Sequence, residues 1–302
     1  MPAGQGLGQA IPRRRLGAEL RRLRDERGKL LQEVAEDLLI STSKLSRLEK
    51  GQAAPRERDM RDLLAYYGQD GTELGERMRR WAREGREAPW WHDDATAAVS
   101  PMLDQYLQYE TAAEEISGFL MDFVPTLLQT PAYARALHAA LYPDKDTGDV
   151  EAFVRLVTRR QEVLARSEYR ARLDVVLDEA VLHRSVGSPE TMREQLLTLA
   201  ACVGSPNVTI RVLRFSAGPH PAQAEGDFTI FHFRRAIDAD VVNLEGRIHD
   251  AYIEDAAGVA NYHRLMEDLR NRAQEFEESA ALLRQLADRY PSLPPPGKVE
   301  IP

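Results

Sequence analysis

The sequence predicts an α+β protein: an all-helical N-terminal domain, followed by a larger α+β domain with a mostly antiparallel sheet flanked by helices. Two observations support this prediction. Apolar residues recur at helical spacing through residues 1–88, whereas β-branched stretches of alternating polarity appear only later in the chain. A length of 302 residues and a hydrophobic content of 43% are sufficient for two packed cores.

The sequence predicts four consecutive parts, and the two predicted domains differ in net charge. The predicted parts are a flexible leader (1–12), a helical domain (13–88), an α+β domain (89–290) and a Pro-rich, extended tail (291–302). Residues 1–88 hold 19 Lys and Arg against 15 Asp and Glu, a balance of +4, whereas the remainder holds 21 against 33, a balance of −12. A basic head on an acidic body favours contact with nucleic acid through the head alone.

The cellular compartment is indicated by the small number of cysteines and by the lack of a membrane span or signal peptide in the sequence. A single cysteine, Cys202, excludes an internal disulfide and fits a reducing cytoplasm. No apolar run approaches the roughly 20 residues that a membrane span needs, and the N-terminus has no apolar core of signal-peptide type. We therefore expect a cytoplasmic protein with no membrane partner.

The first domain is predicted to contain five short helices. Each carries apolar residues on one face, and the expected ranges are 13–28, 31–39, 41–51, 55–68 and 72–86. Ser41 is a good N-cap for the third helix, because its hydroxyl can accept a hydrogen bond from an amide of the first turn. Five short helices with a tight turn between the second and third describe a helix-turn-helix domain.

Residues 31–51, LQEVAEDLLISTSKLSRLEKG, are followed by the pattern P-x-x-x-D-M-R-D-L-L-x-x-Y-G. Together they resemble the xenobiotic-response-element (XRE) class of helix-turn-helix regulators over about residues 13–88. The resemblance implies that an arginine late in the first helix pairs with the glutamate that closes the third. Arg24 and Glu49 match these positions, and such a pair would clamp the third helix to its scaffold.

The sequence departs from this class at two places. Leu30 and Leu31 stand where the class has Ser or Thr and then Gln, so a helix cap and a phosphate contact are missing. Leu39 stands where the turn usually has Gly. A non-glycine residue in a left-handed turn costs roughly 1 kcal/mol, which favours a different shape for this turn.

The third helix would be the recognition helix, whose N-terminal half lies in the major groove. The predicted base-contacting residues are Thr42, Ser43, Lys44, Ser46 and Arg47, of which Lys44 and Ser46 are also within reach of phosphates. Arg47 is expected to read a guanine, because arginine on guanine O6 and N7 is the commonest specific contact. Arg56 and Arg58 are the predicted phosphate contacts. The alternative is a solvated polar face on a small helical bundle.

The second domain mixes two periodicities. Helices are expected near 102–112, 131–141, 149–167, 189–202 and 255–288, and strands at 114–120, 172–178, 207–215, 227–233 and 240–246. The last helical region carries an apolar stripe formed by Tyr262, Leu265, Leu269 and Phe276. This stripe either helps to form a homodimer or packs in the domain's own core.

Several segments of the second domain, among them FVPTLLQTPAYARAL (123–137) and NVTIRVLRFSAGPHP (207–221), resemble a C-terminal domain common in actinobacterial regulators of this class. The function of that domain is poorly defined. The resemblance implies a small partner protein, encoded nearby, that binds the regulator. Polar residues in the matching segments near predicted strand ends form a candidate sensor or partner surface: Arg160, Glu179, His220 and Tyr252. The alternative is that each satisfies local backbone.

Catalysis, a metal and a cofactor are not expected. The sequence contains no nucleotide-binding, nucleophile or zinc-protease motif and no cysteine pair. His220 and His232 could meet across the sheet, but a lone histidine beside a strand is usually structural. Asp178 and Glu179 are interpreted as helix capping at a strand-to-helix turn.

The leading hypothesis is a sequence-specific transcriptional regulator that binds double-stranded DNA as a homodimer. Its second domain would dimerise and receive a signal from a partner protein or a small-molecule ligand. The alternative is a protein-interaction module that binds a small neighbouring-gene product in an antitoxin-like or sequestration pair, with autoregulatory DNA binding.

Overall fold

The computed structural model describes residues 10–86, 89–92, 99–166, 170–233, 239–246 and 250–290. Most of the predicted leader and the whole predicted tail (291–302) lie outside these ranges. The chain divides into two compact units. The helical unit comprises Met1–Ala95, Val99–Ala113 and Phe233–Ala239, and the sheet unit comprises Thr96–Ala98, Glu114–His232 and Asp240–Pro302.

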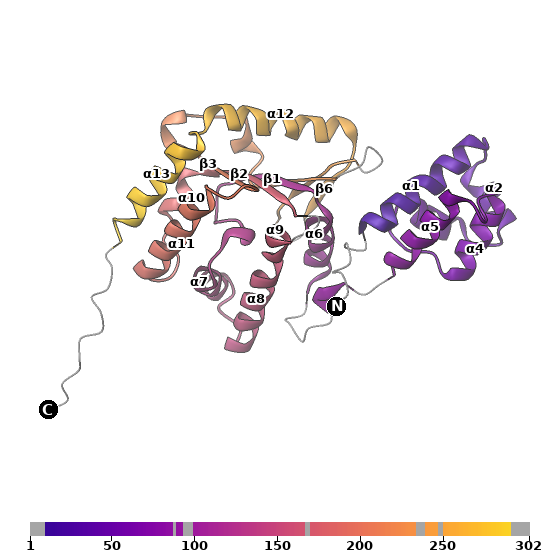
Figure 1. The fold of residues 1–302 in the computed structure, drawn as a ribbon, viewed down its shortest axis with the longest axis horizontal. Coiled ribbons are helices and arrows are strands. Elements are labelled where there is room, and N and C mark those ends of the chain that lie inside the picture. Colours follow the sequence, from indigo (N-terminus) through magenta and orange to yellow (C-terminus); the bar gives the residue numbers. More distant parts are fainter. Residues whose placement is uncertain are drawn as a thin grey trace. The chain divides into compact units, whose positions relative to one another are not determined.

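The helical unit confirms the five helices expected in the first domain (Figure 1). They are α1 (Ala10–Glu26), α2 (Leu31–Asp37), α3 (Thr42–Glu49), α4 (Glu57–Tyr66) and α5 (Glu73–Glu84). A 3₁₀ turn, η1 (Trp90–His92), and α6 (Pro101–Ala112) complete the described part of this unit. The buried Trp91 donates its indole N–H to Asp104 Oδ1 at 2.8 Å, which fixes η1 against α6.

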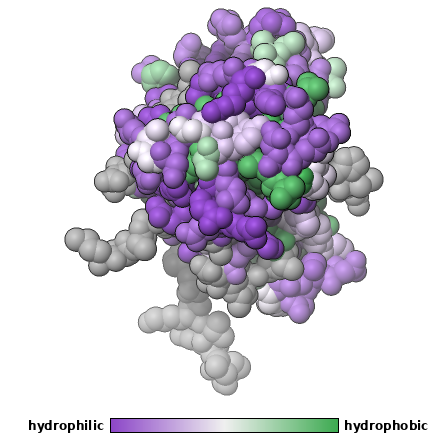
Figure 2. Space-filling view, turned by 90° about the vertical axis from the view of Figure 1, so that its right-hand side faces the viewer, coloured by the Kyte–Doolittle hydropathy of each residue, from purple (hydrophilic) through white to green (hydrophobic). Residues whose placement is uncertain are grey.

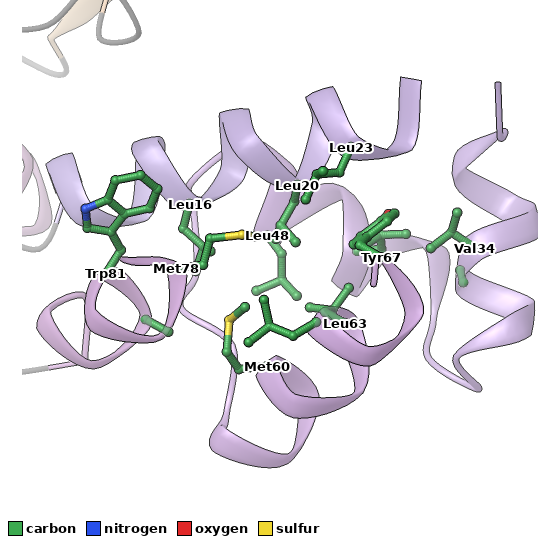
Figure 3. Packing of buried hydrophobic residues seen from close by; sticks show 14 residues of the cluster. Leu16, Leu20, Leu23, Val34, Leu48, Met60, Leu63, Tyr67, Met78 and Trp81 are labelled. Atoms are coloured by element: carbon green, nitrogen blue, oxygen red, sulfur yellow. The ribbon is translucent and has the colours of Figure 1, made fainter. Parts of the chain in front are cut away.

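One apolar core holds the five helices together, and the side chains that form it point toward one another in Figure 3. Leu16, Leu20 and Leu23 bring one face of α1 into this core, as their helical spacing predicts. The other helices contribute Val34, Leu48, Met60, Leu63, Tyr67, Met78 and Trp81, among others. Burying each large apolar side chain contributes about 1.5–3 kcal/mol before conformational entropy is subtracted.

The turn between α2 and α3 contains a residue in the left-handed backbone conformation, although that residue is Leu39 and not glycine. The expectation that this turn has a different shape is therefore wrong. Leu39 adopts a φ of 53°, the only positive φ among the non-glycine residues that the structure describes. Its side chain is 93% exposed. The turn is therefore imposed by the packing of the helices on either side, and Leu39 bears the backbone cost without gaining burial.

Substituting Leu39→Gly should raise the free energy of unfolding of the helical unit by about 0.5–1 kcal/mol. Glycine removes the steric penalty of the left-handed conformation. It also makes the unfolded chain more flexible, which increases the entropy lost on folding, but the first effect is the larger one. Urea unfolding followed by tryptophan fluorescence measures this change. Leu39→Ala is the matched control, since it removes the side chain but keeps the penalty. A gain as large for alanine as for glycine would contradict the explanation.

The sheet unit contains a six-stranded mixed sheet in the order β3-β2-β1-β4-β5-β6. The strands are β1 (Glu115–Leu120), β2 (Arg172–Asp178), β3 (Val208–Leu213), β4 (Phe228–His232), β5 (Val241–Leu244) and β6 (Ala251–Ile253). β1 pairs with β2, and β2 with β3, in parallel. The pairs β1–β4, β4–β5 and β5–β6 are antiparallel, so the predicted mostly antiparallel sheet is confirmed.

Helices cover both faces of this sheet. They are α7 (Pro131–Leu141), α8 (Thr147–Arg160), α9 (Glu162–Ala165), α10 (Glu179–His183), α11 (Pro189–Cys202), α12 (Ala256–Arg272) and α13 (Phe276–Ala287). In Figure 1, α12 runs along one face, and α7 and α8 lie on the opposite side. None of the helices in the described ranges is both long enough and apolar enough to cross a membrane.

The apolar stripe of the last helical region packs in the unit's own core. Tyr262 and Leu269 of α12 are buried in a cluster with Phe119, Phe228 and other sheet residues, and Leu265 packs against the same cluster. Phe276 at the start of α13 is 45% exposed. Three of the four stripe residues therefore support the core interpretation of this stripe.

Candidate nucleic-acid interface

The second and third helices present a polar outer face on an apolar base. Leu45 and Leu48 of α3 are buried in the core of the helical unit. Ser41 caps α3 as predicted, because its Oγ accepts a hydrogen bond from the Lys44 backbone N–H at 3.2 Å. The predicted base-contacting residues that lie exposed on α3 are Thr42, Ser43 and Arg47.

The predicted clamp is present with bidentate geometry. Arg24 Nε and Nη2 donate to the two carboxylate oxygens of Glu49 at 2.8 and 2.9 Å. Arg24 Nη1 also donates to the Lys29 carbonyl oxygen at 3.0 Å. The side chains of Arg24 and Glu49 are only 13% and 5% exposed, and the hydrogen bonds to Glu49 raise the pKa of Arg24. A nearly buried, charge-assisted pair fixes the end of α3 to α1.

Two glycines let the backbones of α1 and of the end of α3 touch. A Cβ at Gly17 would lie 2.6 Å from the carbonyl oxygens of Leu48 and Glu49. Gly51 has a φ of 69°, and a Cβ there would lie 2.8 Å from the Arg14 Cα. Neither position accepts a side chain without a backbone shift. The range expected for the third helix ends at Gly51, whereas no sequence pattern pointed to Gly17.

Lys44 was expected to reach bases or phosphates, but the structure gives it a partner within the helical unit. Its Nζ lies 2.8 Å from Asp59 Oδ2 of α4. Asp59 is 13% exposed at its side chain, and the same oxygen accepts the Arg56 backbone N–H at 3.3 Å. A phosphate would therefore have to compete with Asp59 for Lys44.

The three predicted arginines are free to meet a ligand. Arg47, Arg56 and Arg58 are exposed. Arg58 Nε lies 3.8 Å from Asp62 Oδ2, but its side chain is 85% exposed, so this surface pair is weak. The guanidinium of Arg47 has no ion pair within the described ranges. A space-filling view of the side on which α2 and α4 are drawn shows a mainly hydrophilic surface with small hydrophobic patches (Figure 2).

Comparison with family models supports this interpretation of the first domain and classifies the second. Residues 15–81 match a helix-turn-helix domain model. Residues 103–285 match a model described as a domain of unknown function, DUF5753. The chain belongs to the DUF5753 family. Searches of curated proteins and of solved structures gave no significant match.

The DUF5753 region contains Glu179, one residue of the candidate sensor surface. Asp178 caps α10 by accepting the Ala180 N–H at 2.8 Å, which confirms the capping interpretation for Asp178 but not for Glu179. Glu179 accepts the Phe215 N–H at 2.8 Å and Arg214 Nε at 3.0 Å. Burial raises the pKa of Glu179, but these two groups together with His183 hold the pKa below its usual value. Glu179 is therefore satisfied by its own surroundings.

The other three members of that surface lie on separate elements of the DUF5753 region. Arg160 is buried at the end of α8, Tyr252 lies on β6, and His220 packs edge-on against Phe119 with ring centroids 5.3 Å apart. Within the described ranges, no hydrogen bond, ion pair or ring contact joins Glu179 or His220 to each other or to Arg160 or Tyr252. Glu179 and His220 therefore do not share polar contacts with the rest of the candidate surface.

His220 and His232, which could have met across the sheet, form no ring contact or hydrogen bond with each other. Both ring nitrogens of His220 lack a hydrogen-bond partner among the residues that the structure describes, and burial lowers the pKa of this histidine. His232 instead lies beside Asp240 and His263. Sequence reasoning missed this grouping.

Proposed function

We propose that this protein is a sequence-specific transcriptional regulator of the XRE class that binds double-stranded DNA through α3. The observation that carries the proposal is the clamped α3 with Thr42, Ser43 and Arg47 exposed along its outer side. A small helical bundle needs no bidentate pair to hold one short polar helix in place. A reading helix does need this, because hydrogen bonds to base edges require a fixed approach.

In this proposal each charged group has a separate task. Arg47 donates two hydrogen bonds to guanine O6 and N7, which selects a base pair. Arg56 and Arg58, which follow α3, donate to phosphates and fix the position of the unit on the duplex. Thr42 and Ser43 offer hydroxyl groups that either donate to or accept from base edges.

The experiment is selection of duplexes from a random library by the full-length protein, followed by anisotropy titrations at several salt concentrations. We expect enrichment of a defined motif and an affinity for it that falls linearly with the logarithm of salt concentration. Retention of duplexes without any enriched motif would contradict sequence-specific binding. Failure to retain any duplex would contradict DNA binding altogether.

The DUF5753 region supplies, in this proposal, dimerisation and reception of a signal in the cytoplasm. One helix-turn-helix covers few base pairs, so two copies on half-sites one helical turn apart would supply the missing specificity. The signal is a small partner protein or a small molecule, and the protein itself is not an enzyme. Light scattering of the full chain measures the dimer. Sequencing of DNA and identification of proteins that co-purify from native lysate distinguish a self-sufficient regulator from a partner receptor.

Substituting Asp59→Asn should strengthen DNA binding. Asparagine keeps an oxygen for the Arg56 N–H but loses the charge that holds Lys44. One more cation then becomes available to the phosphates, so the slope of log affinity against log salt should steepen by up to about 1. Asp70→Asn is the control, since it removes the same charge but Asp70 pairs with Arg79 of α5, which is not a predicted DNA contact. An equal change in both variants would mean that only net charge matters.

A further inference from the structure

Three side chains far apart in the sequence converge on the α12 side of the sheet. His232 ends β4, Asp240 directly precedes β5, and His263 lies on α12. His232 Nδ1 lies 2.9 Å, and His263 Nε2 lies 3.0 Å, from the same oxygen of Asp240, Oδ2. One ligand atom from each of the three lies within 4.8 Å of the other two. This is the only such group of His, Cys, Asp or Glu found in the described ranges.

The surrounding fold holds these residues in place. His263 lies one turn after Val259 and one turn before Met266, both of which are buried against the sheet, so helical periodicity directs His263 to the same side. Farther along α12, Arg270 Nη2 lies 2.8 Å from Asp174 Oδ2 of β2. Apolar packing and this ion pair together fix the rotation of α12 about its axis.

A buried hydroxyl group lies at the far nitrogen of one imidazole. Ser117 of β1 is fully buried, and its Oγ lies 2.7 Å from His232 Nε2. When Nε2 carries the proton and donates it to Ser117, Nδ1 keeps its lone pair on the side where Asp240 and His263 meet. Histidines that bind metals almost always donate their other ring N–H in this way.

We propose that His232, Asp240 and His263 bind one divalent transition-metal ion of the Zn²⁺ type, with water as the fourth ligand. Two imidazoles and a carboxylate suit Zn²⁺ and similar ions, whereas Mg²⁺ and Ca²⁺ prefer oxygen ligands alone. Metal–ligand distances of about 2.0–2.1 Å in a tetrahedron place ligand atoms about 3.4 Å apart. The two separations from Asp240 Oδ2, 2.9 and 3.0 Å, need to widen by only a few tenths of an ångström.

The site is accessible to an ion from solvent. The side chains of His232, Asp240 and His263 are 22%, 24% and 40% exposed. This exposure leaves room for a water ligand and for exchange of the ion. The competing interpretation is a His–Asp–His hydrogen-bond cluster, in which the Asp240 carboxylate accepts from both rings and no ion enters.

The test uses full-length protein without a histidine tag, treated with a chelator and then titrated with Co²⁺. We expect one ion per chain, visible absorption typical of four-coordinate Co²⁺, and loss of that absorption when Zn²⁺ is added. Zn²⁺ should also raise the melting temperature followed by far-ultraviolet circular dichroism, because the ion binds only the folded chain.

Variants assign the ion to this site. Ser117→Ala removes only an outer hydrogen-bond partner, so it should weaken Co²⁺ binding by about 10–100-fold. His263→Gln and Asp240→Asn each remove a ligand and should weaken Co²⁺ binding by more than this. His183→Gln is the matched control. His183 pairs with a carboxylate of the same unit, Glu179, at 3.4 Å, but belongs to no three-ligand group among the described residues. Circular dichroism verifies that each variant is folded.

Two results would overturn the proposal. If the wild-type protein binds neither Co²⁺ nor Zn²⁺, the three residues form the hydrogen-bond cluster alone. If His263→Gln and Asp240→Asn bind Co²⁺ as tightly as His183→Gln does, the ion is bound elsewhere on the chain.

Discussion

Replacement of Glu49 by alanine should lower the free energy of unfolding of the helical unit by about 3 kcal/mol. The substitution removes both oxygens that accept from Arg24 and leaves a guanidinium that is only 13% exposed without its main partner. Breaking a buried pair by removing one member costs about 3–5 kcal/mol. The lower end applies because Arg24 keeps the Lys29 carbonyl oxygen and Asp25 as partners.

Tryptophan fluorescence isolates this effect, because Trp81, Trp90 and Trp91, which are all of the chain's tryptophans, lie in the helical unit. Urea unfolding of the full-length protein followed by this signal gives the change. Glu26→Ala is the control, since it removes a pair with Arg22 at the surface and should cost less than about 1 kcal/mol. Equal losses in the two variants would contradict the clamp. So would an altered base preference in Glu49→Ala with an unchanged unfolding curve.

The second large effect is expected on DNA rather than on stability. Arg47→Ala should weaken binding to the selected motif by about 1–3 kcal/mol and relax the preference at one base position. Because Arg47 is exposed and has no ion pair within the described ranges, its loss should leave the unfolding curve unchanged. Selection and anisotropy titration with the variant measure the two changes on DNA.

Arg83→Ala provides the matched control for charge. Arg83 is exposed on α5, so its removal changes net charge by the same amount without touching α3. We expect a smaller loss of affinity that is uniform across sequences. If Arg47→Ala also weakens all sequences uniformly, with the same motif enriched, α3 does not read bases through this residue.

The helical unit could be predicted in detail because its signals are local. Leu16, Leu20 and Leu23 recur at helical spacing, Ser41 marks the start of α3, and both signals depend only on neighbouring residues. The Arg24–Glu49 pair came from the resemblance to a class. The conformation of Leu39 could not be derived in this way, because the packing of whole helices overrides the preference of one exposed residue.

Contacts between distant segments could not be predicted from the sequence. Lys44 and Asp59 meet only because α3 and α4 share a core, and no spacing rule joins them. His232, Asp240 and His263 lack the short spacing of a metal motif, so each was an isolated polar residue until the sheet and α12 were in place. β6 has three residues, none of them buried, which is too few for a periodic signal.

The contact of α1 with α3 through Gly17 and Gly51 limits how this protein can be regulated. The backbones of α1 and α3 are in direct contact, and the Arg24–Glu49 pair reinforces this contact. As a result, α3 cannot tilt or slide independently of α1. In the proposed regulator, an effector of the sheet unit would therefore have two routes to gene control: moving the helical unit as a rigid body or changing the spacing between two copies. Either route alters occupancy of an operator and leaves its consensus sequence unchanged.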